Sequence, residues 1–120
     1  EGSHIGEAQL AIDEPLGDAQ LSILIGRKEL WHKGYGTATT ITLLDHIFNQ
    51  LGLYRAWVDV PEYNTHARDM FEHIGFVHEG TLRKSRPHHG ARFDSVILGM
   101  LKAEYGRKYP HEEGQIVHRV

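Results

Sequence analysis

A helical pattern of apolar residues lies between two segments that alternate like β-strands, and this order constrains the fold more than any other feature. Residues 37–50 carry apolar side chains at helical spacing, and Gly52 follows as a stop signal. Residues 19–25 and 54–60 flank this helix, and both alternate apolar with polar side chains. A helix that connects two strands of one sheet makes them parallel through a right-handed crossover. The sequence therefore predicts a parallel pair of strands with one helix packed on the sheet.

The remaining pattern predicts a second helix and two antiparallel hairpins. Asn64 is a suitable N-cap for the second helix, and Gly75 stands where a left-handed C-cap residue is expected. Alternating segments bounded by turn-forming residues indicate strands that pair with their neighbours along the chain. The expected hairpins join 5–13 to 19–25 across the turn at 14–18, and 76–83 to 93–101 across the turn at 85–90.

These elements predict a single domain of the α/β (α+β) class with a mixed sheet. A chain of 120 residues has the length of one domain. We expect the domain to occupy residues 1–105. Residues 106–120 are polar and lack periodicity, so we expect them to form a flexible tail.

Composition excludes several classes of function. The chain has 13 Lys and Arg against 16 Asp and Glu, and it lacks the basic excess that is typical of nucleic-acid binding. It shows no apolar run of about 20 residues and no signal-peptide pattern, so we expect a cytoplasmic protein without membrane or nucleic-acid partners. The absence of Cys excludes disulfides and cysteine nucleophiles. Of the 10 histidines, His66 and His73 lie two helical turns apart rather than at ligand spacing, so we expect no metal site.

The segment Trp31-His32-Lys33-Gly34-Tyr35-Gly36-Thr37-Ala38 connects the second strand to the first helix. Its glycines allow backbone N–H groups to converge with those of the helix N-terminus, and such a nest binds phosphate or pyrophosphate. The same glycines also suit a turn with no ligand. In the preceding strand Leu24 breaks the alternation just before Gly26, which indicates either a ligand beside the backbone or a strand end covered on both faces.

Four segments in this order and spacing resemble the GNAT N-acetyltransferases, and in particular their RimJ/RimL-like branch of ribosomal-protein-alanine and spermidine acetyltransferases. They are residues 31–36, 64–76, 79–83 and 90–94. The resemblance implies the mixed central sheet of the GNAT acyl-CoA N-acyltransferase fold. The chain begins where the family's N-terminal strand and helices end, so we expect a partial domain that lacks this section.

The resemblance implies acetyl-CoA as co-substrate and assigns residues to its binding. The pantetheine arm would lie between two splayed parallel strands, and the pyrophosphate would lie in the glycine-containing loop. The implied cofactor-binding residues are Leu24, Ile25, Gly26, His32, Lys33, Gly34, Tyr35, Gly36, Thr37, Ala38, Asn64, Ala67 and Phe71.

The implied activity is direct transfer of an acetyl group to a primary amine of a protein N-terminus or small molecule, without a covalent enzyme intermediate. The amine must lose a proton before it attacks the thioester, so a general base is expected. The candidate catalytic residues are Asn64, Asp59 and Glu62, and Tyr63, His66 and Glu29 are further candidates for the base. Many relatives carry a tyrosine where this chain has Phe71, and Phe cannot protonate the departing thiolate.

Two other functions remain open from the sequence. An acetyl-CoA or CoA-binding module without transferase activity would keep the loop and tolerate Phe71. A purely structural interaction domain would keep neither cofactor binding nor transfer. An exposed sheet edge would favour pairing with a second copy, so a homodimer is among the expected partners.

Overall fold

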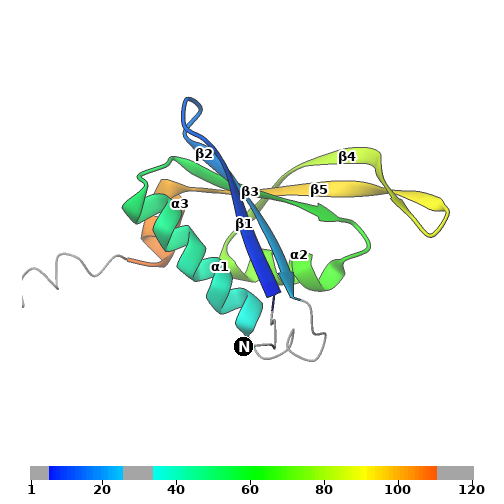
Figure 1. The fold of residues 1–120 in the computed structure, drawn as a ribbon, viewed down its shortest axis with the longest axis horizontal. Coiled ribbons are helices and arrows are strands. Elements are labelled where there is room, and N and C mark those ends of the chain that lie inside the picture. The colour runs from blue at the N-terminus through cyan, green and yellow to red at the C-terminus, as the bar shows by residue number, and fades with distance from the viewer. Residues whose placement is uncertain (1–5, 26–33, 111–120) are drawn as a thin grey trace, which may run out of the picture.

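A computed structural model of the chain describes residues 6–25 and 34–110, which form one five-stranded sheet with helices on one side (Figure 1). The strands have the spatial order β1-β2-β3-β5-β4. Their bounds are Gly6–Asp13 for β1, Asp18–Ile25 for β2, Arg55–Pro61 for β3, Val77–His88 for β4 and Ala91–Leu101 for β5. The helices are α1 (Tyr35–Asp45), the π-helical turn η2 (His46–Gln50), α2 (Thr65–Ile74) and α3 (Lys102–Lys108). The predicted mixed sheet is confirmed.

Strands β2 and β3 are parallel, as the intervening helix predicts, but their ladder is short. It contains three pairs, Asp18 with Arg55, Ala19 with Ala56 and Gln20 with Trp57. Both strands continue past these pairs, and Figure 1 shows them diverging. All other neighbouring strands of the described sheet are antiparallel, and β1 pairs with β2 along its whole length. The sheet is therefore open between β2 and β3 at the end where both strands finish.

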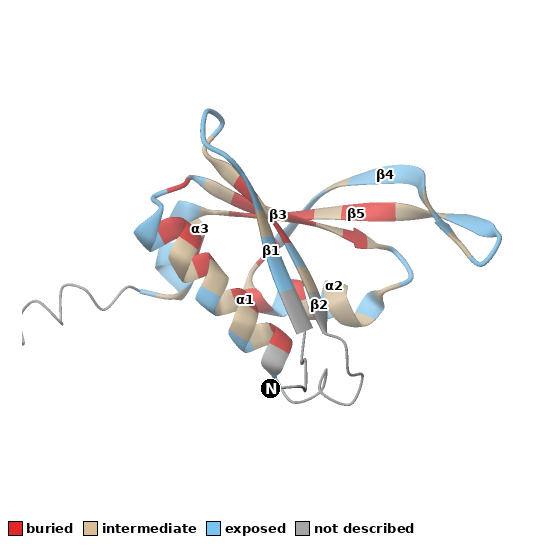
Figure 2. Cartoon of the chain, in the orientation of Figure 1, coloured by how far each residue is buried: buried red, intermediate tan, exposed pale blue. Residues whose placement is uncertain are grey.

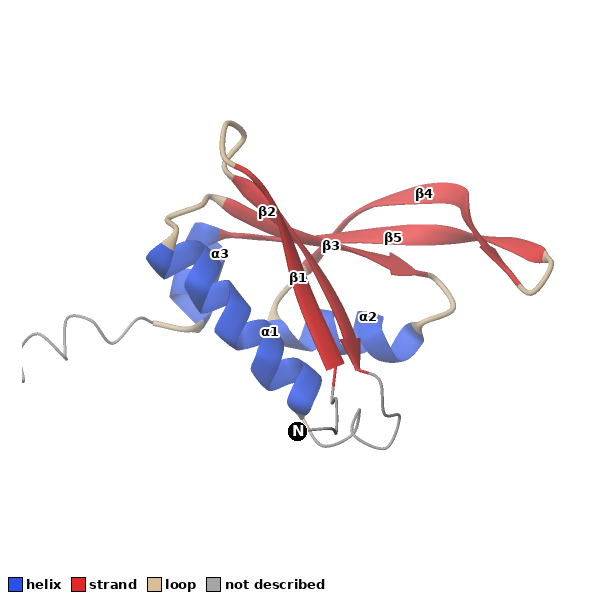
Figure 3. Ribbon diagram, in the orientation of Figure 1, coloured by secondary structure: helices blue, strands red, loops and turns tan. Residues whose placement is uncertain are grey.

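The core lies between the sheet and its helices. Strand β3 alternates buried and half-buried residues, with Ala56, Val58 and Val60 turned toward the helices. Figure 3 shows α1, α2 and α3 gathered on this side of the sheet. Helix α2 contributes Phe71 and Ile74, which are 5% and 1% exposed. The polar residues of β3 consequently lie on the opposite face.

Helix α2 begins and ends at the residues that the sequence predicts. The side chain of Asn64 accepts a hydrogen bond from the N–H of Ala67 at 3.1 Å, which caps the first turn. Gly75 ends the helix with φ 130°, and its N–H donates to the carbonyls of Phe71 and Glu72. A Cβ atom at Gly75 would lie 2.9 Å from Cε of Met100, the flexible end of that side chain, so the positive φ rather than space favours glycine here.

Strand β4 extends further than predicted. It continues to His88, and the turn of the hairpin consists of His89 and Gly90, both at positive φ. Residues 85–88, predicted as part of the turn, are therefore strand. Pro87 is accommodated because β4 is an edge strand, where a missing backbone N–H leaves no partner unpaired. Figure 2 shows that most of β4 is exposed.

The C-terminal boundary also differs from the prediction. Helix α3 includes Gly106 to Lys108, which were assigned to a flexible tail. Tyr105 is 4% exposed, and its ring lies 5.2 Å from that of Phe48. The hydroxyl of Tyr109 donates to the carbonyl of Ile74 at 2.7 Å. These contacts attach the segment to the core, and residues 111–120 lie outside the described part of the chain.

Candidate active site between strands β2 and β3

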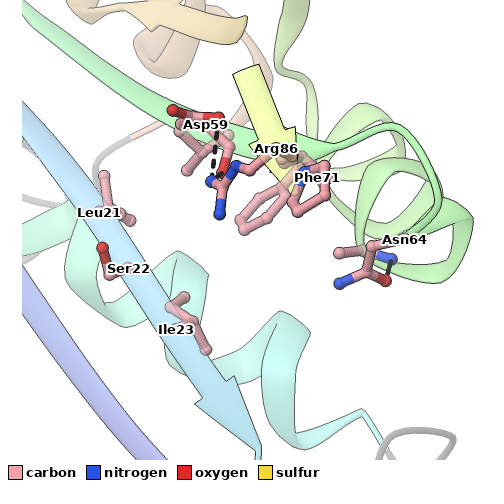
Figure 4. Close-up of a pocket in the computed structure, with 11 residues that line it drawn as sticks. Leu21, Ser22, Ile23, Asp59, Asn64, Phe71 and Arg86 are labelled. Atoms are coloured by element: carbon pink, nitrogen blue, oxygen red, sulfur yellow. Dashed lines mark hydrogen bonds and ion pairs between the residues drawn. The ribbon is translucent and has the colours of Figure 1, made fainter. Parts of the chain in front are cut away.

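A cavity of about 300 Å³ lies where β2 leaves β3. Its walls come from both strands, from α2 and from β4 (Figure 4). A cavity of this volume lies at the lower end of the range for small-molecule sites. The lining residues are Leu21, Ser22, Ile23, Val58, Asp59, Val60, Pro61, Asn64, Ala67, Phe71 and Arg86.

The cavity has an apolar side and a charged side. On the helix side of the sheet Phe71 lines the cavity, and its ring meets that of Phe76 edge to face at 5.3 Å. On the opposite face Asp59 and Arg86 are the charged residues of the lining. The two sides meet because neighbouring residues of β3 point to opposite faces, so Val58 and Asp59 line the same opening.

Arg86 is held by three hydrogen bonds at the charged side. Its Nη2 donates to Oδ1 of Asp59 at 3.1 Å and to the Asp59 carbonyl at 3.3 Å. Its Nε donates to Oγ of Ser95 at 3.1 Å, and the same oxygen accepts from the Ser85 hydroxyl at 2.7 Å. Ser95 is 1% exposed. The Asp59 and Arg86 side chains are therefore fixed relative to the sheet.

A bulge in β4 directs Arg86 toward the cavity. The register with β5 shifts between Leu82 and Arg86, and Lys84 within this bulge has φ 56°. The N–H of Lys84 donates to Oδ1 of Asp94 at 2.8 Å, and its carbonyl accepts from Nε of Arg92 at 2.8 Å. Sequence reasoning missed Arg86, because it assigned this residue to a turn.

Asn64 lines the cavity from the start of α2. Its Oδ1 is used as the helix cap, so its amide nitrogen is the group left for a ligand. Figure 4 shows the Asn64 side chain across the open space from Ile23. Ala67 and Phe71 follow on the same helix and also line the cavity. These three cofactor-binding candidates lie together.

The other catalytic candidates divide between the cavity and its surroundings. Asp59 lines the cavity, but Glu62 does not. The Glu62 carboxylate accepts a hydrogen bond from the N–H of Asp94 at 2.8 Å, which ties it to β5. Tyr63 stacks on His88 with ring centroids 3.9 Å apart. His66 lies half-buried on α2 outside the lining.

The glycine-containing loop is described from Gly34 onward. Gly34 is the N-cap of α1 with φ 81°, a left-handed conformation that favours glycine. The N–H of Ala38 donates to the Gly34 carbonyl at 2.9 Å, so the N–H groups of Tyr35, Gly36 and Thr37 precede the helical hydrogen bonds. They form the positive end of the helix dipole.

Some of the candidates at the strand end and in the loop are described only in part or not at all. Leu24 and Ile25 end β2, paired with β1. The candidates Gly26, Glu29, His32 and Lys33 lie outside the described residues, as does Trp31.

The described residues contain neither a group of metal ligands nor a membrane-spanning helix. Within residues 6–25 and 34–110, no three His, Asp or Glu side chains are grouped as metal ligands. None of the helices in these ranges is long and apolar enough to cross a bilayer.

Comparison with known proteins gives consistent matches. A family model described as an acetyltransferase (GNAT) domain matches residues 1–77. The SPbeta prophage-derived uncharacterized N-acetyltransferase YokL of Bacillus subtilis (strain 168) is 29% identical over 73 residues, which are 61% of this chain and 41% of YokL. The spermidine/spermine N-acetyltransferase SpeG from Vibrio cholerae superposes with a TM-score of 0.80 at 27% identity, over 88% of this chain and 62% of SpeG. A solved probable acetyltransferase gives 0.79 at 32% identity, over 86% and 58%.

The chain thus spans about three fifths of these solved relatives and less than half of YokL. The family model covers more than half of the chain, including β1, β2, α1, β3 and α2. The structural match to SpeG covers 88% of the chain and therefore extends beyond the residues that the family model matches. The fold and the matched residues together show that the chain belongs to the GNAT acetyltransferase family.

Proposed function

We propose that this chain binds acetyl-CoA and transfers its acetyl group to a primary amine. The observation that carries the proposal is the cavity between β2 and β3, which has an apolar side and a charged side. The names of the matched relatives, all acetyltransferases, support the same activity. Because acetyl-CoA is an intracellular metabolite, we place this activity in the cytoplasm.

The residues present fit acetyl-CoA. The N-terminus of α1 offers three backbone N–H groups to a pyrophosphate, and the left-handed Gly34 shapes the approach. The apolar wall of Ile23, Ala67 and Phe71 suits the acetyl-pantetheine end. The bound co-substrate supplies the thioester as an activated acetyl donor.

Asp59 is the cavity residue best suited to accept the proton of the amine. Its Oδ1 is held by Arg86, and no described donor reaches Oδ2. The ammonium of the acceptor first gives one proton to Asp59, after which the neutral nitrogen bonds to the acetyl carbon, the bond from carbon to sulfur breaks, and the nitrogen loses its second proton to water. Phe71 offers no proton to the departing thiolate, so water supplies it. No covalent bond to the protein forms in this sequence.

The binding half of the proposal is tested by titrating acetyl-CoA into the chain and following the heat. We expect micromolar binding that Gly34→Glu abolishes, because the new carboxylate lies at the phosphate site. Gly34→Asn is the matched control, since Asn tolerates the left-handed conformation and adds no charge. Equal binding by the Glu variant would contradict the assigned site.

The transfer half is tested by thiol release from acetyl-CoA with a panel of amines. We expect release that depends on the amine and falls about 100-fold or more in Asp59→Asn. A chain that binds acetyl-CoA but releases thiol with no amine would be the binding module that Phe71 permits. A folded chain that binds no acetyl-CoA would contradict the whole proposal.

The acceptor and the oligomeric state are also matters of proposal. SpeG is titled a spermidine/spermine N-acetyltransferase, so polyamines belong in the panel beside amino acids and peptides.

Strand β4 is an edge strand with Val77 and Leu82 half exposed, which supports pairing of two copies along this edge. Sedimentation of the chain at several concentrations tests this pairing.

A further inference from the structure

We infer that Arg86 selects amine acceptors that carry a carboxylate next to the amine, such as α-amino acids. The inference rests on the proposed acetyl transfer and names the acceptor class for the same cavity.

The guanidinium of Arg86 has hydrogen-bonding capacity that the fold does not use. An arginine carries five N–H donors, on Nε, Nη1 and Nη2. Nε donates to Ser95 and Nη2 donates to Asp59, and no described residue accepts from Nη1. Figure 4 shows the guanidinium pointing from β4 toward the space between β2 and Phe71. The two N–H groups of Nη1 are therefore available to an acceptor in the cavity.

The two charges of the cavity lie side by side. Among the lining residues Arg86 is the cation and Asp59 the anion, and their nearest atoms are 3.1 Å apart. An α-amino acid carries an ammonium and a carboxylate on the same carbon. Its ammonium is attracted to Asp59, the base of the proposed reaction, while its carboxylate reaches Nη1 of Arg86. Guanidinium binds carboxylate with charge-assisted hydrogen bonds, whereas a polyamine would place a second cation here.

The pair is held in place before any ligand arrives. Ser95 is buried and accepts from Nε, and the bulge around Lys84 is fixed by Asp94. A fixed side chain loses little conformational entropy when it binds a ligand. It also discriminates between acceptors, since an acceptor without the carboxylate makes no charge-assisted hydrogen bonds to Arg86.

The first test compares acceptors in pairs, each an amino acid and its amide, for example methionine and methioninamide. Thiol release from acetyl-CoA gives kcat/KM for both members with the unmodified chain and with Arg86→Gln. The amine of the amide has a different pKa from that of the amino acid. This difference is the same for both protein variants, so it cancels when the ratio of kcat/KM for the amino acid to kcat/KM for the amide is compared between them. We expect Arg86→Gln to lower this ratio about tenfold or more, mainly by raising KM for the amino acid.

Two further variants serve as controls. Arg55→Gln removes the same charge from the neighbouring part of the sheet, on β3, where Arg55 is paired with Asp18 and Glu79 outside the cavity lining. We expect it to leave the ratio unchanged. Arg86→Lys keeps the charge without the planar fork and should give an intermediate ratio, provided that its melting curve shows a folded chain. Equal losses for the amino acid and the amide in Arg86→Gln would show that Arg86 only holds Asp59, and would overturn the inference.

A binding measurement separates this inference from the proposed transfer. In the CoA-saturated chain, NMR follows the Nε–H signals of the arginines, assigned with the Arg86 and Arg55 variants. We expect the amino acid, but not its amide, to shift the Arg86 signal, with the Arg55 signal as reference. Absence of this shift overturns the inference whether or not thiol is released. Thiol release with amides or polyamines alone would support the transfer and overturn the acceptor class.

Discussion

Asp59 and Arg86 meet at the cavity although they belong to different strands, β3 and β4. Asp59 follows the alternation of a clearly predicted strand, so its place near a strand end and a cleft could be expected. Arg86 lies in a segment rich in Pro, His and Gly, for which a turn was the natural interpretation. Its position depends on the hydrogen bond from the backbone N–H of Lys84 to the side chain of Asp94. The alternation of apolar and polar residues in the sequence does not predict such a contact.

Asn64 caps helix α2 in addition to its proposed binding role, and substitutions measure how much the cap contributes to stability. We expect Asn64→Ala to lower the free energy of unfolding by about 1 kcal/mol, because the cap on the Ala67 N–H is lost. Asn64→Asp keeps an acceptor oxygen and should restore most of this stability. Urea unfolding followed by circular dichroism gives the comparison. A stability of Asn64→Ala equal to that of the unmodified chain would show that the cap contributes nothing.

Among the elements, those with strong periodicity were predicted and those fixed by tertiary contacts were not. The crossover helix, β3 and α2 appear close to their predicted bounds, because apolar spacing and capping residues define them. Helix α3 was missed because seven residues carry little periodic signal, and packing of Tyr105 on Phe48 stabilises it. The extension of β4 was missed because an edge strand needs neither alternation nor freedom from Pro.

The stability of the fold is expected to depend on pH in the alkaline range, because of two tyrosines in helix α3 and at its C-cap. Burial raises the pKa of Tyr105 above its usual value of 10.0, and Asp45 and Tyr109 raise it further. Burial also raises the pKa of Tyr109. The folded chain thus holds these protons to higher pH than the unfolded chain, so stability is complete below pH 10 and falls as pH rises through the folded pKa values.

The urea midpoint should therefore stay constant below pH 10 and decrease as the pH rises above it. Tyr105→Phe should reduce this decrease, because it removes one of the two phenols whose pKa is raised. Parallel pH profiles for the two proteins would contradict the assignment to Tyr105. Measurements at two salt concentrations separate burial from the charge of Asp45, since only the latter is screened.

At the scale of the whole molecule, the short β2–β3 ladder is the junction between two parts of the sheet. Three residue pairs connect the β1–β2 hairpin to the three-stranded β3–β5–β4 unit, and α1 packs near both β2 and α2. The remaining length of both strands forms the walls of the cavity. The position of the ladder's end was not predicted: the disturbance of β2 was expected near Leu24, whereas the pairing ends at Gln20.

The same ladder has a consequence for the order in which the chain folds. The two hairpins join near neighbours in sequence, but Asp18 and Arg55 are separated by 37 residues and must meet across the whole crossover. Contacts between distant residues form more slowly than local ones, so the β2–β3 junction is expected to close after the transition state. The cavity is then absent from the transition state, and a ligand of the cavity stabilises only the native chain.

Acetyl-CoA should accordingly slow unfolding in rough proportion to its occupancy and leave the refolding rate unchanged, as rapid urea dilution and urea jumps would measure. Faster refolding with added acetyl-CoA would instead place the junction among the first contacts made.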